Sequence, residues 1–143
     1  MKKITTLLHS CVVAFATVAI SLSLFSCQGV ASFTIEKIIE QANAECPMYI
    51  DEDIVCDRIY ISGSNVIYNY QTSPDIVEGI LLLGDTAKQF LFDDLQSMAA
   101  TDKDLRTMID LCVEAKYNIV YKYNDNMGYS ARVSISYHEL ANI

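Results

Sequence analysis

The feature that most constrains this chain is an apolar N-terminal run, which separates a targeting segment from the part that can fold as a domain. After a basic start with Lys2 and Lys3, residues 4–25 are apolar apart from scattered Thr, Ser and His9, and no acidic residue precedes Glu36. This layout is typical of a secretory signal, although the run is also long enough to cross a bilayer. We expect residues 1–26 to be a cleaved signal peptide.

The end of this run, Leu24-Phe25-Ser26-Cys27, resembles the lipobox of bacterial prolipoproteins, with Phe25 where a smaller residue is usual. The Cys27 thiol is the only side chain there that can take a diacylglycerol thioether, and the small Ser26 lets a peptidase reach the bond before it. The resemblance implies lipidation of Cys27 and a lipid anchor in the outer membrane of a Gram-negative envelope, facing the periplasm or the cell surface. The alternatives are a cysteine that ends an ordinary cleaved signal and a retained membrane helix.

Charge restricts the partners of the mature chain. Removing 26 of the 143 residues leaves 117, which is one domain of ordinary size. The full sequence has 10 basic and 18 acidic residues, and the signal holds Lys2 and Lys3 but no acid, so the remainder has a formal charge of −10. Such a surface repels phosphate backbones. We expect no nucleic-acid partner, and membrane contact through the lipid rather than a basic patch.

After a short tether over residues 27–31, hydrophobic periodicity predicts a single α+β domain over residues 32–143. The expected architecture is a four-stranded antiparallel sheet of two hairpins, with about three helices packed on one face, in the order αββααββ. The stretch 72–84 has no assignable period. The predicted helices cover residues 32–46, 85–98 and 101–112, with a single turn at 138–140, and the predicted strands cover residues 54–61, 66–71, 117–123 and 129–137.

Two predicted strands share one pattern. Residues 65–70 and 118–123 both have the form Asn-aliphatic-aliphatic-Tyr-x-Tyr. Duplication of a helix-plus-hairpin unit and convergent strand chemistry both explain this similarity. In either case we expect the two segments to occupy equivalent places in the antiparallel sheet, with four tyrosines lining the interface between sheet and helices and their hydroxyls reaching its rim.

Alternation along the strands then defines a second face of the sheet. If Ala131, Val133 and Ile135 face the helices, the opposite face carries a small apolar island beside two of the few basic residues. Cover by a neighbouring loop is the alternative to a binding surface. The candidate binding patch consists of Tyr60, Ile67, Val120, Lys122 and Arg132.

The cysteines fit an oxidising compartment. Cys46 and Cys112 form the candidate disulfide, which would leave Cys56 as a thiol. Pairing of Cys56 with either neighbour, or three buried thiols, are the alternatives. A metal site is weakly supported, because there is no CxxC pair and His138 is the only histidine after the signal.

Two acidic or polar stretches resemble parts of a calcium site without completing one. Asp51, Glu52, Asp53 and Asp57 are interpreted as a solvated acidic loop, because no Gly-containing ligand loop surrounds them. Residues 124–128 are interpreted as a hairpin turn. We expect no metal, no cofactor and no catalytic residue, because the chain has neither a base near a nucleophile nor a Gly-rich phosphate loop.

Three segments of the mature chain, Ala44-Glu45-Cys46-Pro47-Met48, residues 65–68 and residues 111–115 with the Tyr-rich strand after them, resemble a group of small exported bacterial domains without assigned activity. The resemblance covers most of residues 31–140 and implies fold and compartment only. The leading hypothesis is therefore a membrane-anchored envelope lipoprotein with a non-catalytic binding or structural domain and a protein or glycan partner. The alternatives are an inhibitor of an envelope enzyme and, third, a hydrolase acting on an envelope polymer.

Overall fold

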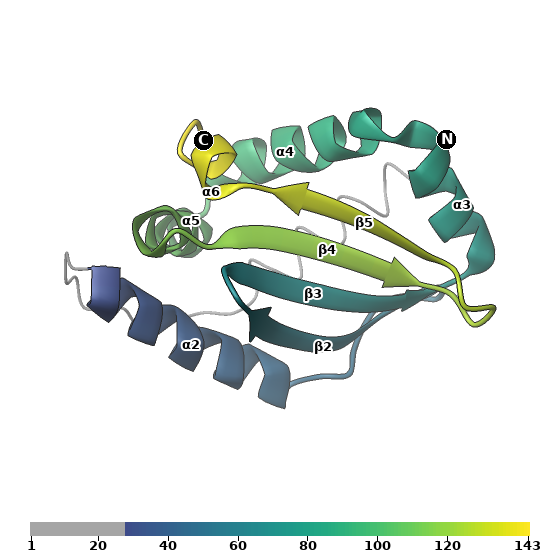
Figure 1. Cartoon of the computed structure of the whole chain (residues 1–143), viewed down its shortest axis with the longest axis horizontal. Coiled ribbons are helices and arrows are strands. Elements are labelled where there is room, and N and C mark those ends of the chain that lie inside the picture. Colours follow the sequence, from purple (N-terminus) through teal and green to yellow (C-terminus); the bar gives the residue numbers. More distant parts are fainter. Residues whose placement is uncertain (1–27) are drawn as a thin grey trace.

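The computed structural model describes residues 28–143, which form one sheet and the helices around it (Figure 1). Cys27 and the signal lie outside the described residues. In chain order the elements are α2 (Gln28–Ala44), β1 (Met48–Asp51), β2 (Ile54–Ser62), β3 (Asn65–Thr72), α3 (Pro74–Leu83), α4 (Asp85–Ala99), α5 (Lys103–Ala115), β4 (Asn118–Asn124), β5 (Ser130–Ile135) and α6 (Tyr137–Leu140).

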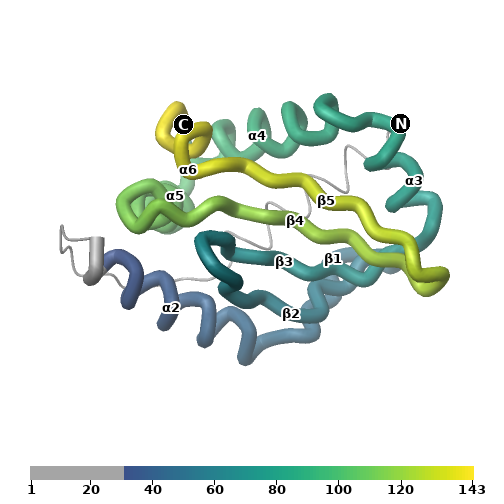
Figure 2. The backbone as a smooth tube through the Cα atoms, in the orientation of Figure 1, coloured from purple at the N-terminus to yellow at the C-terminus, as the bar shows by residue number. Residues whose placement is uncertain are grey.

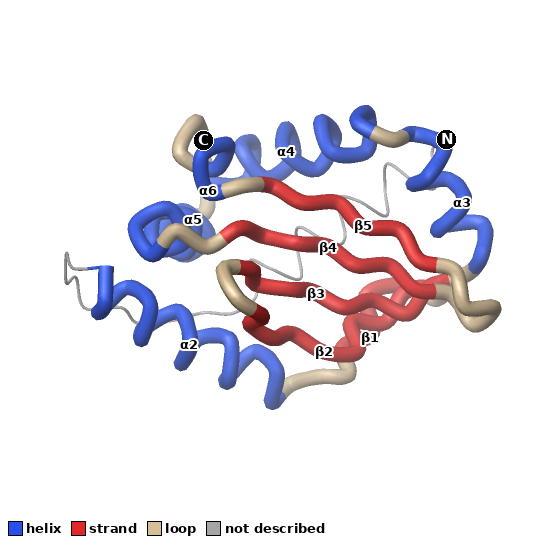
Figure 3. Tube along the Cα trace, viewed as in Figure 1, coloured by secondary structure: helices blue, strands red, loops and turns tan. Residues whose placement is uncertain are grey.

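The sheet has five strands in the order β1-β2-β3-β4-β5, with β3 and β4 parallel and every other neighbouring pair antiparallel (Figure 3). The prediction of a four-stranded antiparallel sheet is therefore wrong in strand number and in direction. The physical reason is the crossover between β3 and β4. Parallel neighbours need a long connection, and α3, α4 and α5 supply it. The structure has five helices in the described part, rather than about three.

The repeated Asn-aliphatic-aliphatic-Tyr-x-Tyr pattern forms this central parallel pair. Asn65 is the register partner of Asn118, and the remaining positions of the two segments follow in step. Tyr68 stacks on Tyr121 with 5.7 Å between ring centroids. The Asn118 side-chain amide donates a hydrogen bond of 3.0 Å to Asn65 Oδ1. The two segments are thus equivalent, as expected, but they lie side by side as neighbours.

Two elements have no clear signal in the sequence. β1 lies where no helix or strand was predicted, and its four residues are too few to show a period. α3 occupies most of the unassigned stretch 72–84. Its apolar residues do not form one buried stripe, because Leu81 and Leu82 are 59% and 81% exposed. β1 pairs with β2 and is the edge strand opposite β5, and in Figure 2 it overlaps the end of β2 nearest α3.

Helix α2 begins four residues before the predicted start at residue 32. Residues 28–31, expected to be tether, are helical, and Ser32 lies inside the helix. The Ser32 hydroxyl forms a hydrogen bond of 3.1 Å with the Tyr117 hydroxyl next to β4. The helix ends at Ala44, two residues before the cis Cys46–Pro47 peptide bond. The domain therefore starts almost directly after Cys27 in sequence. Across residues 28–143, none of the helices has the length and apolar character needed to cross a membrane.

The core lies on the sheet face that alternation predicted. Ala131, Val133 and Ile135 are at most 5% exposed, while the intervening Ser130, Arg132 and Ser134 are exposed. The expectation that the tyrosine hydroxyls reach the rim is wrong, because all four rings are at most 1% exposed. The buried tyrosines are Tyr68, Tyr70, Tyr121 and Tyr123.

The C-terminal turn α6, predicted at residues 138–140, is held by Glu139. Its carboxylate accepts hydrogen bonds from the Ser136 backbone N–H and hydroxyl, and its other oxygen lies 2.7 Å from Lys88 Nζ on α4. The Lys88 ammonium, together with the Ser136 donors, lowers the pKa of Glu139 from 4.5 to about 2. Because the pKa is lower in the folded protein, these contacts stabilise the fold above pH 4.5, and the stabilisation is lost as the pH falls toward 2.

We expect Glu139→Gln to lower the free energy of unfolding by about 1 kcal/mol at pH 7, a value reduced for solvent screening because both side chains are more than a third exposed. The difference from wild type should shrink as the pH falls from 4.5 to 2. Urea denaturation of both proteins across this pH range measures the difference in their free energies of unfolding. Glu40→Gln, at an exposed ion pair on α2, is the control and should show no comparable pH dependence. A Glu139→Gln difference that is constant with pH would contradict the assignment.

Candidate functional site

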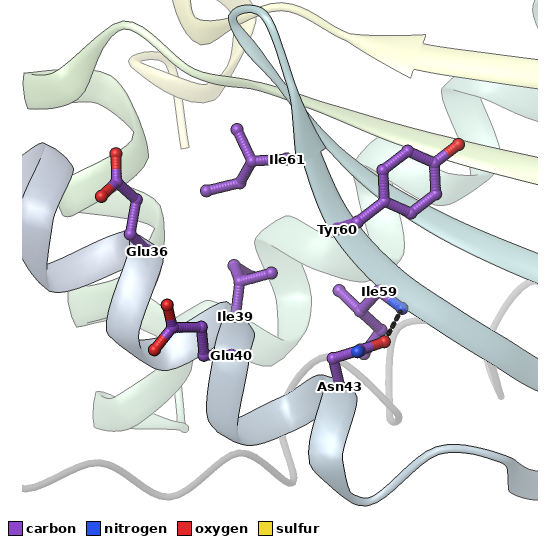
Figure 4. Close-up of a pocket in the computed structure, with 7 residues that line it drawn as sticks. All are labelled: Glu36, Ile39, Glu40, Asn43, Ile59, Tyr60 and Ile61. Atoms are coloured by element: carbon purple, nitrogen blue, oxygen red, sulfur yellow. Dashed lines mark hydrogen bonds between the residues drawn. The ribbon is translucent and has the colours of Figure 1, made fainter.

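A groove of about 370 Å³ lies between α2 and β2 (Figure 4). On α2 its lining residues recur at the spacing i, i+3, i+4 and i+7, so they form one stripe of the helix. On β2 they are three consecutive residues near the hairpin. The lining residues are Glu36, Ile39, Glu40 and Asn43 from α2, with Ile59, Tyr60 and Ile61 from β2.

The floor of the groove is apolar and its rim is acidic. Ile39 and Ile59 are only 4% and 1% exposed, and they join the core below. Glu36 and Glu40 are exposed one turn apart on the helix wall, as Figure 4 shows. Glu40 pairs with Lys37 at 2.9 Å. The groove therefore has an apolar floor on which a side chain can pack and a negatively charged rim above that floor.

The other wall is the outer edge of β2. The neighbouring strand β1 pairs only with residues 54–56 of β2. Farther along, the Ile59 backbone N–H donates a hydrogen bond of 3.0 Å to Asn43 Oδ1 of α2. At this point the Asn43 side-chain amide thus accepts the hydrogen bond that a neighbouring strand would otherwise accept. Beyond Ile59, the described part of the chain has no strand beside the outer edge of β2.

The candidate binding patch predicted from the sequence is assembled on one sheet face in two adjacent rows. Tyr60 pairs with Ile67 and Ile67 with Val120, while Lys122 is directly opposite Arg132. The apolar island is not an open surface, however, because Ile67 and Val120 are 6% and 0% exposed. Alternation placed these side chains on the correct face, but burial depends on tertiary cover.

Tyr60 connects this face to the groove. Its ring is half-buried, and the Arg58 guanidinium lies 4.2 Å from the ring centroid. Tyr60 also lines the groove. It is therefore the member of the predicted patch that is best placed to contact a partner. Glu36, Glu40 and Asn43 had no role in the sequence-based hypothesis, although their helical spacing was visible.

A second pocket, also of about 370 Å³, lies between α3 and the turn that joins β4 to β5. Leu81, Met127 and Tyr129 are 59–69% exposed at its margin. Sequence reasoning missed it because one wall is α3, whose segment had no assignable period. Its lining residues are Pro74, Val77, Glu78, Leu81, Asp125, Met127 and Tyr129.

The two stretches that resemble parts of a calcium site have structural roles. Asp125 Oδ1 accepts hydrogen bonds of 2.8 Å from the backbone N–H groups of Met127 and Tyr129, which closes the hairpin turn. Asp51 Oδ1 accepts from the Glu52 N–H at 2.7 Å, and Asp57 accepts from the Asn69 side chain at 3.2 Å. Within residues 28–143 no cluster of three or more His, Cys, Asp or Glu side chains has the geometry to hold a metal ion.

The three cysteines of residues 28–143 are all thiols. Cys46 Sγ donates to the Ala42 carbonyl at 3.8 Å. Burial raises the pKa of the Cys46 thiol, whereas a hydrogen bond with Cys56 lowers it, so these two side chains are in contact. Burial raises the pKa of Cys112 to about 12 and keeps that thiol protonated. The structure gives the predicted Cys46–Cys112 disulfide no support.

No protein family model matches the chain, and no curated protein matches its sequence. The fold, in contrast, is found among solved structures of bacterial proteins connected with export.

Two of these structures cover most of the chain. A candidate secreted protein from Pseudomonas aeruginosa superposes with a TM-score of 0.61 and 15% identity, over 82% of this chain and 99% of the other. The type II secretion system pilotin AspS from Vibrio cholerae superposes with a TM-score of 0.50 and 16% identity, over 78% of this chain and 94% of the other. At these identities the similarity shows a shared fold.

Proposed function

We propose that this chain is a membrane-anchored lipoprotein of the bacterial envelope whose domain binds a partner protein without catalysing a reaction. The observation that carries this proposal is the groove between α2 and β2. It combines an apolar floor, an acidic rim and an uncovered strand edge, which are features that recognise a polypeptide.

Two further observations support the proposal. The signal-like run ends in a lipobox-like sequence at Cys27, and α2 starts at the next residue, so an anchor there would keep the groove near a membrane. One structure that shares the fold is a pilotin of a secretion system, and this similarity favours a protein partner over a glycan.

Site-specific photocrosslinking tests the proposal. A photoreactive phenylalanine in place of Tyr60 should give an ultraviolet-dependent adduct of one discrete mass in cells, because that side chain lies at the groove. The matched control is the same replacement at Tyr129, an exposed tyrosine at the second pocket. Excess wild-type protein should reduce the yield of the Tyr60 adduct, because it competes for the same partner. No discrete adduct from Tyr60, or adducts from Tyr129 alone, would refute the assignment of the groove.

A further inference from the structure

The hairpin of β2 and β3 defines which backbone groups face the groove. Ser62 pairs with Asn65 across a two-residue turn, so Ser62, Tyr60 and Arg58 make hydrogen-bonded pairs with β3, in alternation. The backbone groups of Ile59 and Ile61 then point away from β3, toward the outer edge. The hydrogen bond from the Ile59 N–H to Asn43 Oδ1 agrees with this assignment.

Ile61 is consequently the residue whose N–H and C=O both lie on the uncovered part of the edge. Its side chain is partly buried and points to the helix side, where it lines the groove with Ile39 (Figure 4). A strand laid against Ile61 would continue the line of β1, which occupies the same edge at residues 54–56. Exposed edges of this kind accept a further strand through main-chain hydrogen bonds.

We propose that an extended segment of the partner adds as a strand to the outer edge of β2, with its central residue opposite Ile61. This inference rests on the proposed function and names the shape and chemistry of the partner segment. Side chains at alternate positions of a strand share a face. On the groove face the segment has an apolar residue, seated between Ile39 and Ile61, and two positions away a lysine or arginine near Glu36 and Glu40.

Charge favours this occupant over an acidic one. Glu36 and Glu40 line the groove, Lys37 beside them is already paired with Glu40, and the mature chain has an excess of ten acidic residues. A basic segment would be attracted and an acidic one repelled. The apolar residue supplies burial, while the main-chain bonds to Ile61 require the segment to be extended.

The test uses the full-length protein labelled with nitrogen-15 and a capped peptide, Thr-Lys-Thr-Val-Thr, added antiparallel to β2 so that its Lys lies beyond Ile61 and away from Ile59, whose N–H is already bonded to Asn43. With Val opposite Ile61, the Val N–H bonds to the Ile61 carbonyl and the Val carbonyl accepts the Ile61 N–H. We expect saturating peptide to shift the Ile61 amide resonance and to slow its hydrogen exchange by about tenfold or more. N-methylation of Val should abolish both effects. N-methylation of the Thr before it, whose N–H points away from β2, should preserve them.

Two protein variants test whether negative charge at the groove contributes to peptide binding. Glu36→Gln should weaken peptide binding by about threefold, as expected for one exposed charge pair. Glu78→Gln, the same change at the second pocket, should leave binding unchanged. An Ile61 amide that does not respond to the unmodified peptide would overturn the proposal. So would equal binding of the N-methyl-Val peptide, or preferential binding of a helical peptide with the same charge.

The two proposals fail in different ways. If the photoreactive residue at position 60 crosslinks to a partner but the Ile61 amide does not respond to the peptide, the protein-binding proposal is supported and strand addition is wrong. If Tyr60 captures no partner while the peptide protects Ile61, the edge accepts strands but the proposed cellular function is wrong.

Discussion

Tyr121→Ala is expected to lower the free energy of unfolding by about 3–5 kcal/mol, because it removes a fully buried ring from the centre of the sheet. Tyr121 lies on β4 and stacks on Tyr68 of β3, so the substitution opens a cavity at the parallel pair that joins the two halves of the fold. Small domains are stable by only about 5–15 kcal/mol, so a large part of the stability should be lost. Chemical denaturation followed by far-ultraviolet circular dichroism measures the change.

Two matched variants show whether burial of the ring is the cause. Tyr121→Phe keeps the ring and removes only its buried hydroxyl, so it should change the free energy of unfolding by about 1 kcal/mol or less. Tyr49→Ala removes a tyrosine that is 81% exposed on β1, and its effect should stay within about 0.5 kcal/mol. If Tyr121→Ala were no more destabilising than Tyr49→Ala, the central role of the tyrosine pair would be wrong.

Cys27→Ala is expected to abolish fatty-acid labelling and to move the protein from the membrane fraction to the soluble fraction. The reason is chemical, because alanine has no thiol to form the diacylglycerol thioether. Metabolic labelling with a fatty-acid analogue, followed by membrane fractionation of wild type and variant, measures both effects.

Cys11→Ala is the matched control, since Cys11 lies within the apolar run and away from the lipobox-like end. It should label and fractionate like wild type. If Cys27→Ala also behaves like wild type, the lipoprotein hypothesis fails. Residues 4–25 would then act as an ordinary signal or as a retained anchor.

Local periodicity predicted the elements whose one face is buried. Leu105, Met108, Ile109 and Cys112 stand at helical spacing, and all four are buried on α5. Asp102 caps the start of this helix, because its side chain accepts hydrogen bonds from the N–H groups of residues 104 and 105. Both features depend on interactions within a few residues, which is why the sequence shows them.

The candidate site was predicted only in part. Tyr60 was placed on a binding patch from strand parity, and it lies at the groove. The groove itself needs α2 to pass along β2, and Glu36 and Asn43 are separated from Ile59 and Ile61 by about twenty residues of intervening chain. A pattern within one helix or strand does not reveal contacts between residues that far apart in the chain. Predicted patch residues Ile67 and Val120 faced the expected side and were nevertheless buried.

By itself the sequence determined the acidic character of residues 27–143, the alternation of β5 and the equivalence of the two Tyr-x-Tyr segments, and it predicts the targeting segment before them. Only the tertiary structure decided that these segments are parallel neighbours, because the side-chain period of a strand is the same in parallel and antiparallel sheets. It also decided which edge stays uncovered. The position of the β2 edge beside α2 follows from long-range packing of the crossover helices and β1, and this packing is what creates the groove.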